Sequence, residues 1–132
     1  MSYAIWHNPR CSKSRAALAL LEAAGVDFRV RRYRDDPPTV AELEQLVQAL
    51  GVEPQTVVRM GEPVAKELGL ASARLDRSEW LRILAANPIL LERPIVVAPD
   101  GRAVIGRPPE NVSALLRTAA AHRTSTAVGE ES

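Results

Sequence analysis

The pattern of apolar and polar positions at the start of the chain predicts a short strand followed by a helix. Residues 3–7 carry aromatic and branched side chains, which are typical of a half-buried strand. Asn8 and Pro9 then break the pattern. After this break, apolar side chains recur at helical spacing until Gly25, a residue that commonly ends helices. We therefore expect a helix over residues 12–24.

The middle of the chain shows helical patterns after one more strand. In residues 26–33, apolar side chains alternate with charged ones, which predicts a strand with one buried face. Thr39 and Asp76 each stand three positions before a glutamate, which is the spacing of a helix cap. Apolar side chains at helical spacing follow each of these caps. A shorter helix is expected over residues 53–59. These signals predict a helical segment over about residues 39–86.

The last third of the sequence returns to strands and ends in a helix. The segment "PIVVAPDGRAVIG" predicts two strands joined by a hairpin turn at residues 99–102. Two prolines at 108 and 109 open a final helix. The order predicts a mixed α/β protein in which residues 1–117 form a single domain. Residues 118–132 are small and polar, and we expect them to form a disordered tail.

The length, net charge and apolar content of the chain limit the classes of protein to which it can belong. A chain of 132 residues can bury a core without disulfide or metal staples. A formal net charge of +1 gives no general attraction to nucleic acid or membranes, so neither is an expected partner. The sequence has no run of about eighteen apolar residues, and its first ten residues do not resemble a secretion signal. We expect a soluble, cytoplasmic protein.

The single cysteine, Cys11, is the first candidate for chemistry. It cannot form an internal disulfide, and neither His7 nor His122 belongs to a metal-ligand cluster, so no metal site is expected. Cys11 stands where a strand gives way to a helix, a position at which free backbone amides and the helix dipole stabilise a thiolate. The alternative is a small buried hydrophobic residue, but the polar surroundings of Cys11 favour a reactive thiol.

Neighbours of the cysteine support this interpretation. The segment "HNPRCSKSR", residues 7–15, places positive charge on both sides of the thiol, including Arg15, and hydroxyl groups at Ser12 and Ser14. These residues form the predicted helix-start loop. His7, at the end of the first strand, either orients the loop or tunes the thiol through a hydrogen bond, or it is an ordinary loop histidine.

Three arginines stand at junctions between an element and a turn. Arg59 ends an apolar run, Arg93 precedes Pro94 at a strand start, and Arg107 lies between a glycine and a proline. Taken singly, each is most simply an ordinary surface arginine. Guanidinium groups bind oxyanions through a fixed set of donors, so arginines aimed into a shared cleft would form an anion site.

Five separated segments together resemble the glutaredoxin-linked arsenate reductases. They are "HNPRCSKSR", "YRDDPPT", "VVRMGEPVAKELGL", "NPILLERPIVV" and "GRPPENV", in this order and covering nearly the whole chain except the tail. The resemblance implies a thioredoxin-like fold with a mixed four-stranded sheet and a helical insert between the second and third strands. It also implies a cis peptide bond before Pro94.

The same resemblance implies residue roles and co-substrates. Cys11 would be the nucleophile, His7 its supporting partner, and Arg59, Arg93 and Arg107 the oxyanion clamp. The enzyme would reduce arsenate to arsenite with glutathione as co-substrate, a glutaredoxin as partner and no bound cofactor. The residues just after the cysteine differ from those of the arsenic-resistance enzymes and are closer to chromosomal relatives.

Two other functions remain open at the level of the sequence. One is a glutathione-dependent thiol-disulfide reductase, in which Ser14 stands in place of a second, resolving cysteine. The other is a regulator similar to the Spx-type proteins, which bind RNA polymerase and commonly sense oxidation through a cysteine pair. Ser14 disfavours a disulfide sensor, and the three arginines favour oxyanion chemistry.

Overall fold

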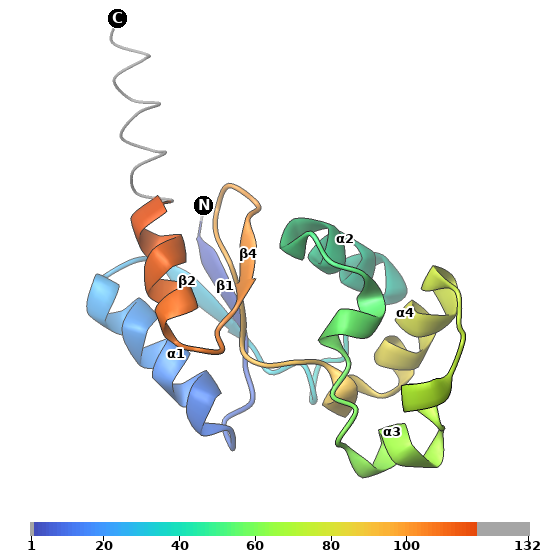
Figure 1. The fold of residues 1–132 in the computed structure, drawn as a ribbon. Helices are drawn as coiled ribbons and strands as arrows, with labels where there is room; N and C mark the ends of the chain where they lie inside the picture. Colours follow the sequence, from blue (N-terminus) through green and yellow to red (C-terminus); the bar gives the residue numbers. More distant parts are fainter. Residues whose placement is uncertain (1, 119–132) are drawn as a thin grey trace, which may run out of the picture. The chain divides into compact units, whose positions relative to one another are not determined.

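The computed structural model describes residues 2–118 of the chain. These residues form two compact units: one is Arg32–Glu92, and the other is built from the segments on either side of it. We call the second one the sheet unit and Arg32–Glu92 the helical unit (Figure 1). That residues 1–117 form a single domain stays a prediction. The expected tail lies outside the described residues except for Thr118, which is helical.

The sheet unit contains one mixed four-stranded sheet. Its strands are ordered β2-β1-β3-β4, where β1 is Tyr3–Trp6, β2 Phe28–Arg31, β3 Ile95–Val97 and β4 Ala103–Ile105. The strand β1 pairs with β2 in parallel and with β3 antiparallel, and β3 and β4 form the hairpin that the sequence predicts. The helical unit is inserted between β2 and β3, so the expected sheet with its insert is confirmed.

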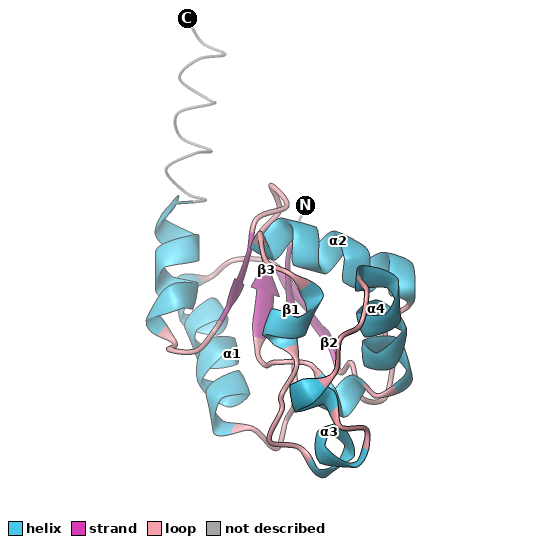
Figure 2. Ribbon diagram, turned by 45° about the vertical axis from the view of Figure 1, so that its right-hand side comes forward, coloured by secondary structure: helices cyan, strands magenta, loops and turns pink. Residues whose placement is uncertain are grey.

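Two helices cover one face of this sheet. Helix α1, Ser12–Ala24, connects β1 to β2, and the final helix begins at residue 110; the two lie side by side in both views (Figures 1 and 2). Buried side chains from both helices, from β1 and β3 and from the residue just after β3 form the core between them: Tyr3, Ile5, Ala17, Leu21, Val96, Ala98, Val112 and Leu115. This core packs α1 and the final helix against the sheet.

The helix predicted over residues 12–24 is confirmed as α1, whereas the second strand is shorter than expected. Gly25 caps α1 with φ of 69°, a left-handed conformation that glycine adopts without the strain of a side chain. The strand over residues 26–33 is reduced to β2, which lies at the sheet edge. Val30, expected on its buried face, is 45% exposed.

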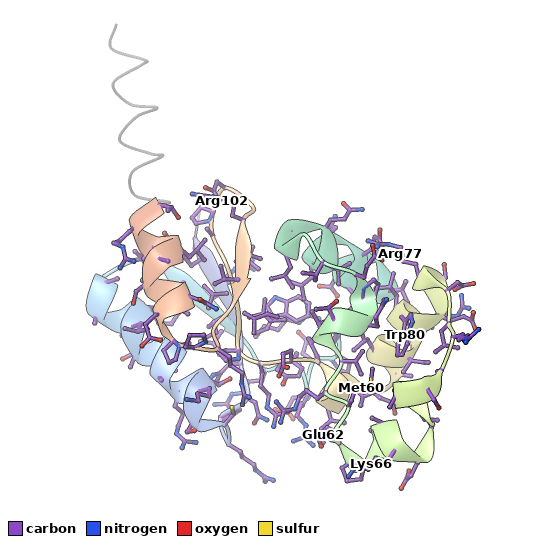
Figure 3. The ribbon with its side chains drawn as sticks, in the orientation of Figure 1. Met60, Glu62, Lys66, Arg77, Trp80 and Arg102 are labelled. Atoms are coloured by element: carbon purple, nitrogen blue, oxygen red, sulfur yellow. The ribbon has the colours of Figure 1, made fainter. Side chains whose placement is uncertain are left out.

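Two helices of the helical unit begin at the predicted cap residues. Its three α-helices are α2, Val40–Leu50, α3, Pro63–Glu67, and α4, Arg77–Ala86; the short 3₁₀ helices are η1, Pro54–Val57, η2, Leu70–Ser72, and η3, Pro88–Leu90. Both α2 and α4 begin with complete capping boxes, at Thr39 and Asp76. Arg77, labelled in Figure 3, pairs with Glu44 on α2 at 3.0 Å and so joins the two helices. None of the described helices is long and apolar enough to cross a membrane.

Replacing Leu21 with alanine should destabilise the protein by about 3 kcal/mol, because the side chain is fully buried and its loss leaves a cavity. The matched control is Leu68→Ala. Leu68 is 51% exposed, so its truncation should change the unfolding free energy by less than about 1 kcal/mol. Chemical denaturation of both variants measures the difference. Equal losses would contradict the assignment of Leu21 to the core.

Candidate active site around Cys11

Cys11 occupies the N-cap position of α1. Its backbone is extended, with φ of −97° and ψ of 123°, and its carbonyl accepts the first helical hydrogen bond from the amide of Arg15 at 3.0 Å. The thiol is free and largely buried, with 8% of the residue exposed. The first turn of α1 contains no acidic residue that would offset the positive end of the helix.

Side chains of α1 shape the loop that precedes Cys11. Ser14 is fully buried, and its Oγ accepts a hydrogen bond from the amide of Asn8 at 3.2 Å. The Arg15 Nη1 donates to the carbonyl of Pro9 at 2.9 Å. Two of the predicted helix-start residues therefore hold the loop in place, whereas the third, Ser12, is exposed.

Arg107 links the thiol to the strand that follows the insert. Its Nη2 lies 3.7 Å from the Cys11 Sγ, and its Nε donates to the backbone carbonyl of Arg93 at 2.8 Å. The peptide bond that follows Arg93 is cis, which is the geometry that the resemblance implies for Pro94. The Arg93 side chain also interacts with the Cys11 thiol, so two of the three arginines singled out in the sequence are neighbours of Cys11.

These surroundings favour the ionised thiol. Burial raises the pKa of Cys11, but the backbone amide of Ser14, the guanidinium groups of Arg107 and Arg93 and the amide of Lys13 all lower it, so that the pKa falls from 9.0 to about 7. Near neutral pH a large fraction of the thiol is therefore a thiolate. A buried thiolate beside guanidinium groups can act as a nucleophile toward an anionic electrophile.

His7 lies at the end of β1, one residue beyond the strand. It is 5% exposed, and its amide donates to the carbonyl of Arg31 at 2.8 Å, which extends the pairing with β2. The Arg31 guanidinium stacks on the ring of Trp6 at 5.0 Å. His7 therefore stands at a firmly held strand end, from which the loop to Cys11 begins.

Arg59 belongs to the helical unit and is held by two carboxylates. Its Nε lies 3.1 Å from Glu62, labelled in Figure 3, and its Nη1 lies 3.0 Å from Glu92. Burial lowers the pKa of Arg59, but the two carboxylates outweigh this effect and raise it, so the group stays charged. The acids that hold Arg59 were not anticipated from the sequence.

Sequence reasoning also missed the residues that support Arg107. The Nδ2 of Asn111 donates to the carbonyls of Ile105 at 2.9 Å and Arg107 at 3.3 Å. Gly106 lies in a space too small for a side chain, since an added Cβ would stand 2.8 Å from the Pro94 ring. A glycine that directly follows a strand was the available signal for close backbone approach.

Among residues 2–118, no cluster of histidine, cysteine and carboxylate side chains has the arrangement of a metal site. The groups around Cys11 are instead amides and guanidinium groups. These are donors suited to an anion.

The sheet order, the insert and the cysteine at the start of α1 define a thioredoxin-like fold. Residues 6–115 match the model of the ArsC family, and the chain belongs to this family. It is 49% identical over 113 residues to an arsenate reductase of Neisseria meningitidis, a match covering 85% of this chain and 96% of that protein. An arsenate reductase of Escherichia coli is 33% identical over 127 residues, a match covering 96% of this chain and 89% of that protein.

A solved structure confirms the fold. The arsenate reductase of Vibrio cholerae superposes with a TM-score of 0.80 at 46% identity, and the match covers 85% of this chain and 95% of that one. The family also includes proteins without an assigned activity. One of them, the E. coli protein YfgD, is 46% identical over 109 residues, which cover 82% of this chain and 91% of that protein.

Proposed function

We propose that this protein reduces arsenate to arsenite, with the Cys11 thiolate as nucleophile and with glutathione and a glutaredoxin as electron donors. The observation that carries the proposal is the 3.7 Å contact between the Arg107 guanidinium and the Cys11 sulfur at the start of α1. The arsenate reductases among the relatives support the choice of substrate.

Electrostatics explain why this arrangement suits arsenate. Arsenate is an oxyanion, so the approach of a thiolate brings like charges together. Guanidinium groups and the amides at the start of a helix offset that repulsion and bind the oxygens of the anion. Arg107 and Arg93 would hold the anion beside the sulfur, and Arg59 is proposed as a third arginine of the clamp from the resemblance alone.

The chemistry balances with two external thiols. The Cys11 sulfur forms a bond to arsenic while one arsenate oxygen takes up protons and leaves as water. Glutathione then displaces a second oxygen, again as water, and joins the adduct. The glutaredoxin thiolate attacks the glutathione sulfur, the sulfur–arsenic electron pair passes to arsenic, and the products are a mixed disulfide and arsenic reduced from As(V) to As(III). Water releases arsenite, and Cys11 regains its thiol.

The position that could hold a second cysteine supports an external reductant. Ser14 is fully buried and its hydroxyl is engaged by the amide of Asn8, so it has a structural role in the loop. Cys11 is the only cysteine in the sequence, so no disulfide can form within one chain. Reducing equivalents must then come from other thiols. His7 is proposed to keep the Cys11 loop in position from the end of β1.

A coupled assay tests this function. The protein is mixed with glutathione, glutaredoxin, glutathione reductase and NADPH, and NADPH oxidation is followed with arsenate and separately with a glutathione mixed disulfide. Turnover that depends on arsenate is the expected result. Turnover with the mixed disulfide alone, above the background that glutaredoxin gives beside the Cys11→Ser variant, would establish a thiol-disulfide reductase instead. No turnover above that background with either substrate would reject both enzymatic functions.

A further inference from the structure

We propose that Asn111 and Gly106 are positioning residues that hold Arg107 against the Cys11 sulfur. The inference rests on the proposed function in taking Cys11 as the reactive thiol. It concerns the segment between β4 and the final helix, which we call the arginine turn, residues 105–111. In Figure 1 this segment runs from the end of β4 to the helix that lies beside α1.

The amide of Asn111 fixes the arginine turn from the helix side. Its Nδ2 donates to two carbonyls, those of Ile105 and Arg107, which lie on either side of Gly106. The backbone amide of Asn111 in turn donates to the carbonyl of Pro108 at 3.0 Å. One side chain therefore ties the last residue of β4 and the backbone of Arg107 to the first turn of the final helix.

Gly106 fixes the same turn from the sheet side. Its amide donates to the carbonyl of Pro94 at 2.8 Å. A Cβ at this position would stand 2.8 Å from the Pro94 Cγ and 3.1 Å from the Val112 Cγ2, and 3.6 Å from the Cβ of Ala17 on α1. The turn can pack this closely against the proline before β3, against α1 and against the final helix only because residue 106 has no side chain.

The consequence of the two restraints is the direction of the Arg107 side chain. With its backbone held at both ends, the guanidinium reaches the Arg93 carbonyl through Nε and the Cys11 sulfur through Nη2. Arginine has several rotatable bonds, and a freely moving side chain would spend little time in this position. The hydrogen bonds of Asn111 and Gly106 go to backbone carbonyls and not to the sulfur, so the two residues act through Arg107.

The test is a double-mutant cycle read from the titration of Cys11. The rate of Cys11 alkylation by iodoacetamide is measured against pH for the full chain and for Asn111→Ala, Arg107→Ala and the double variant. Asn111→Ala should raise the apparent pKa from about 7 to about 8, which lowers the thiolate fraction at pH 7 about fivefold. In the Arg107→Ala background, Asn111→Ala should cause no further rise in the apparent pKa of Cys11.

A matched control is available in the helical unit. Asn87 also uses its Nδ2 to bind a backbone carbonyl, that of Ile83, at 3.1 Å. Asn87→Ala removes the same kind of hydrogen bond and should leave the Cys11 titration unchanged. A shift of equal size in this control would mean that the Asn111 effect is general loosening of the fold, and it would overturn the inference.

Two further outcomes decide the matter. An apparent pKa of Cys11 in Asn111→Ala that equals the value in the unmodified protein overturns the inference. The inference is also overturned if Asn111→Ala shifts this pKa equally in the presence of Arg107 and in the Arg107→Ala background. Gly106→Ala should raise the apparent pKa in the same direction, and the Asn111 cycle stands by itself if that variant does not fold. The titration uses no arsenate, so absent arsenate turnover would reject the proposed function and leave this result standing.

Discussion

Replacing Cys11 with serine should lower arsenate turnover by at least about a thousandfold, the largest effect we expect from any single change. A serine hydroxyl keeps nearly the same size but has a far higher pKa than a thiol, so it supplies no anionic nucleophile at neutral pH. The environment that lowers the thiol pKa to about 7 cannot compensate for this difference. The coupled assay with arsenate measures the loss.

The folding of the Cys11→Ser variant must be measured alongside its turnover. Cys11 is largely buried but makes no side-chain cap of α1, so the substitution should leave the helix and its thermal unfolding nearly unchanged. Ser12 is an exposed neighbour, and Ser12→Ala is the matched control that should retain turnover. A folded Cys11→Ser protein that still reduces arsenate would contradict the role of the thiol.

Replacing Arg107 with alanine should lower kcat/KM for arsenate by about a hundredfold, as the loss of one group that stabilises developing negative charge commonly does. The change removes two contacts together: the one to the Cys11 sulfur at 3.7 Å and the one to the Arg93 carbonyl at 2.8 Å. The thiol would therefore be less ionised, and the anion would lose a donor. Steady-state kinetics over a range of arsenate concentrations measure both effects.

Two variants separate this role from a general effect of charge. Arg107→Lys keeps the positive charge but lacks the planar set of donors that contacts the carbonyl and sulfur together, so it should restore only part of the activity. Arg102, labelled at the β3–β4 hairpin in Figure 3, pairs with Asp100 at 2.7 Å. Arg102→Ala removes the same charge there and should retain full activity. Equal losses in Arg102→Ala and Arg107→Ala would contradict a specific role for Arg107.

Local sequence signals predicted most of the fold. The bounds of α1 follow from the apolar spacing and from Gly25, and the cap at Thr39 is present with both of its hydrogen bonds. The hairpin between β3 and β4 follows from its turn residues. These signals were sufficient because each depends on residues that are near each other in the chain.

Features that depend on distant residues were harder to predict. Alternation suggested that Val30 would be buried, but its exposure depends on the place of β2 at the sheet edge, which alternation alone does not reveal. The carboxylate partners of Arg59 include Glu92, which is thirty-three positions away. The contact of Arg107 with Cys11 spans ninety-six positions. The sequence indicated the arginine itself, and the resemblance supplied its expected role.

The pKa of Cys11 is the quantity that most directly tests the proposed chemistry, because the first step, the attack on arsenate, requires the Cys11 thiolate. The rate of alkylation of the wild-type thiol by iodoacetamide, measured from pH 5 to pH 10, yields this value. We expect a midpoint of about 7. A midpoint at or above about 8.5, the value of an ordinary free thiol, would contradict the claim that amides and guanidinium groups hold this sulfur in its ionised form.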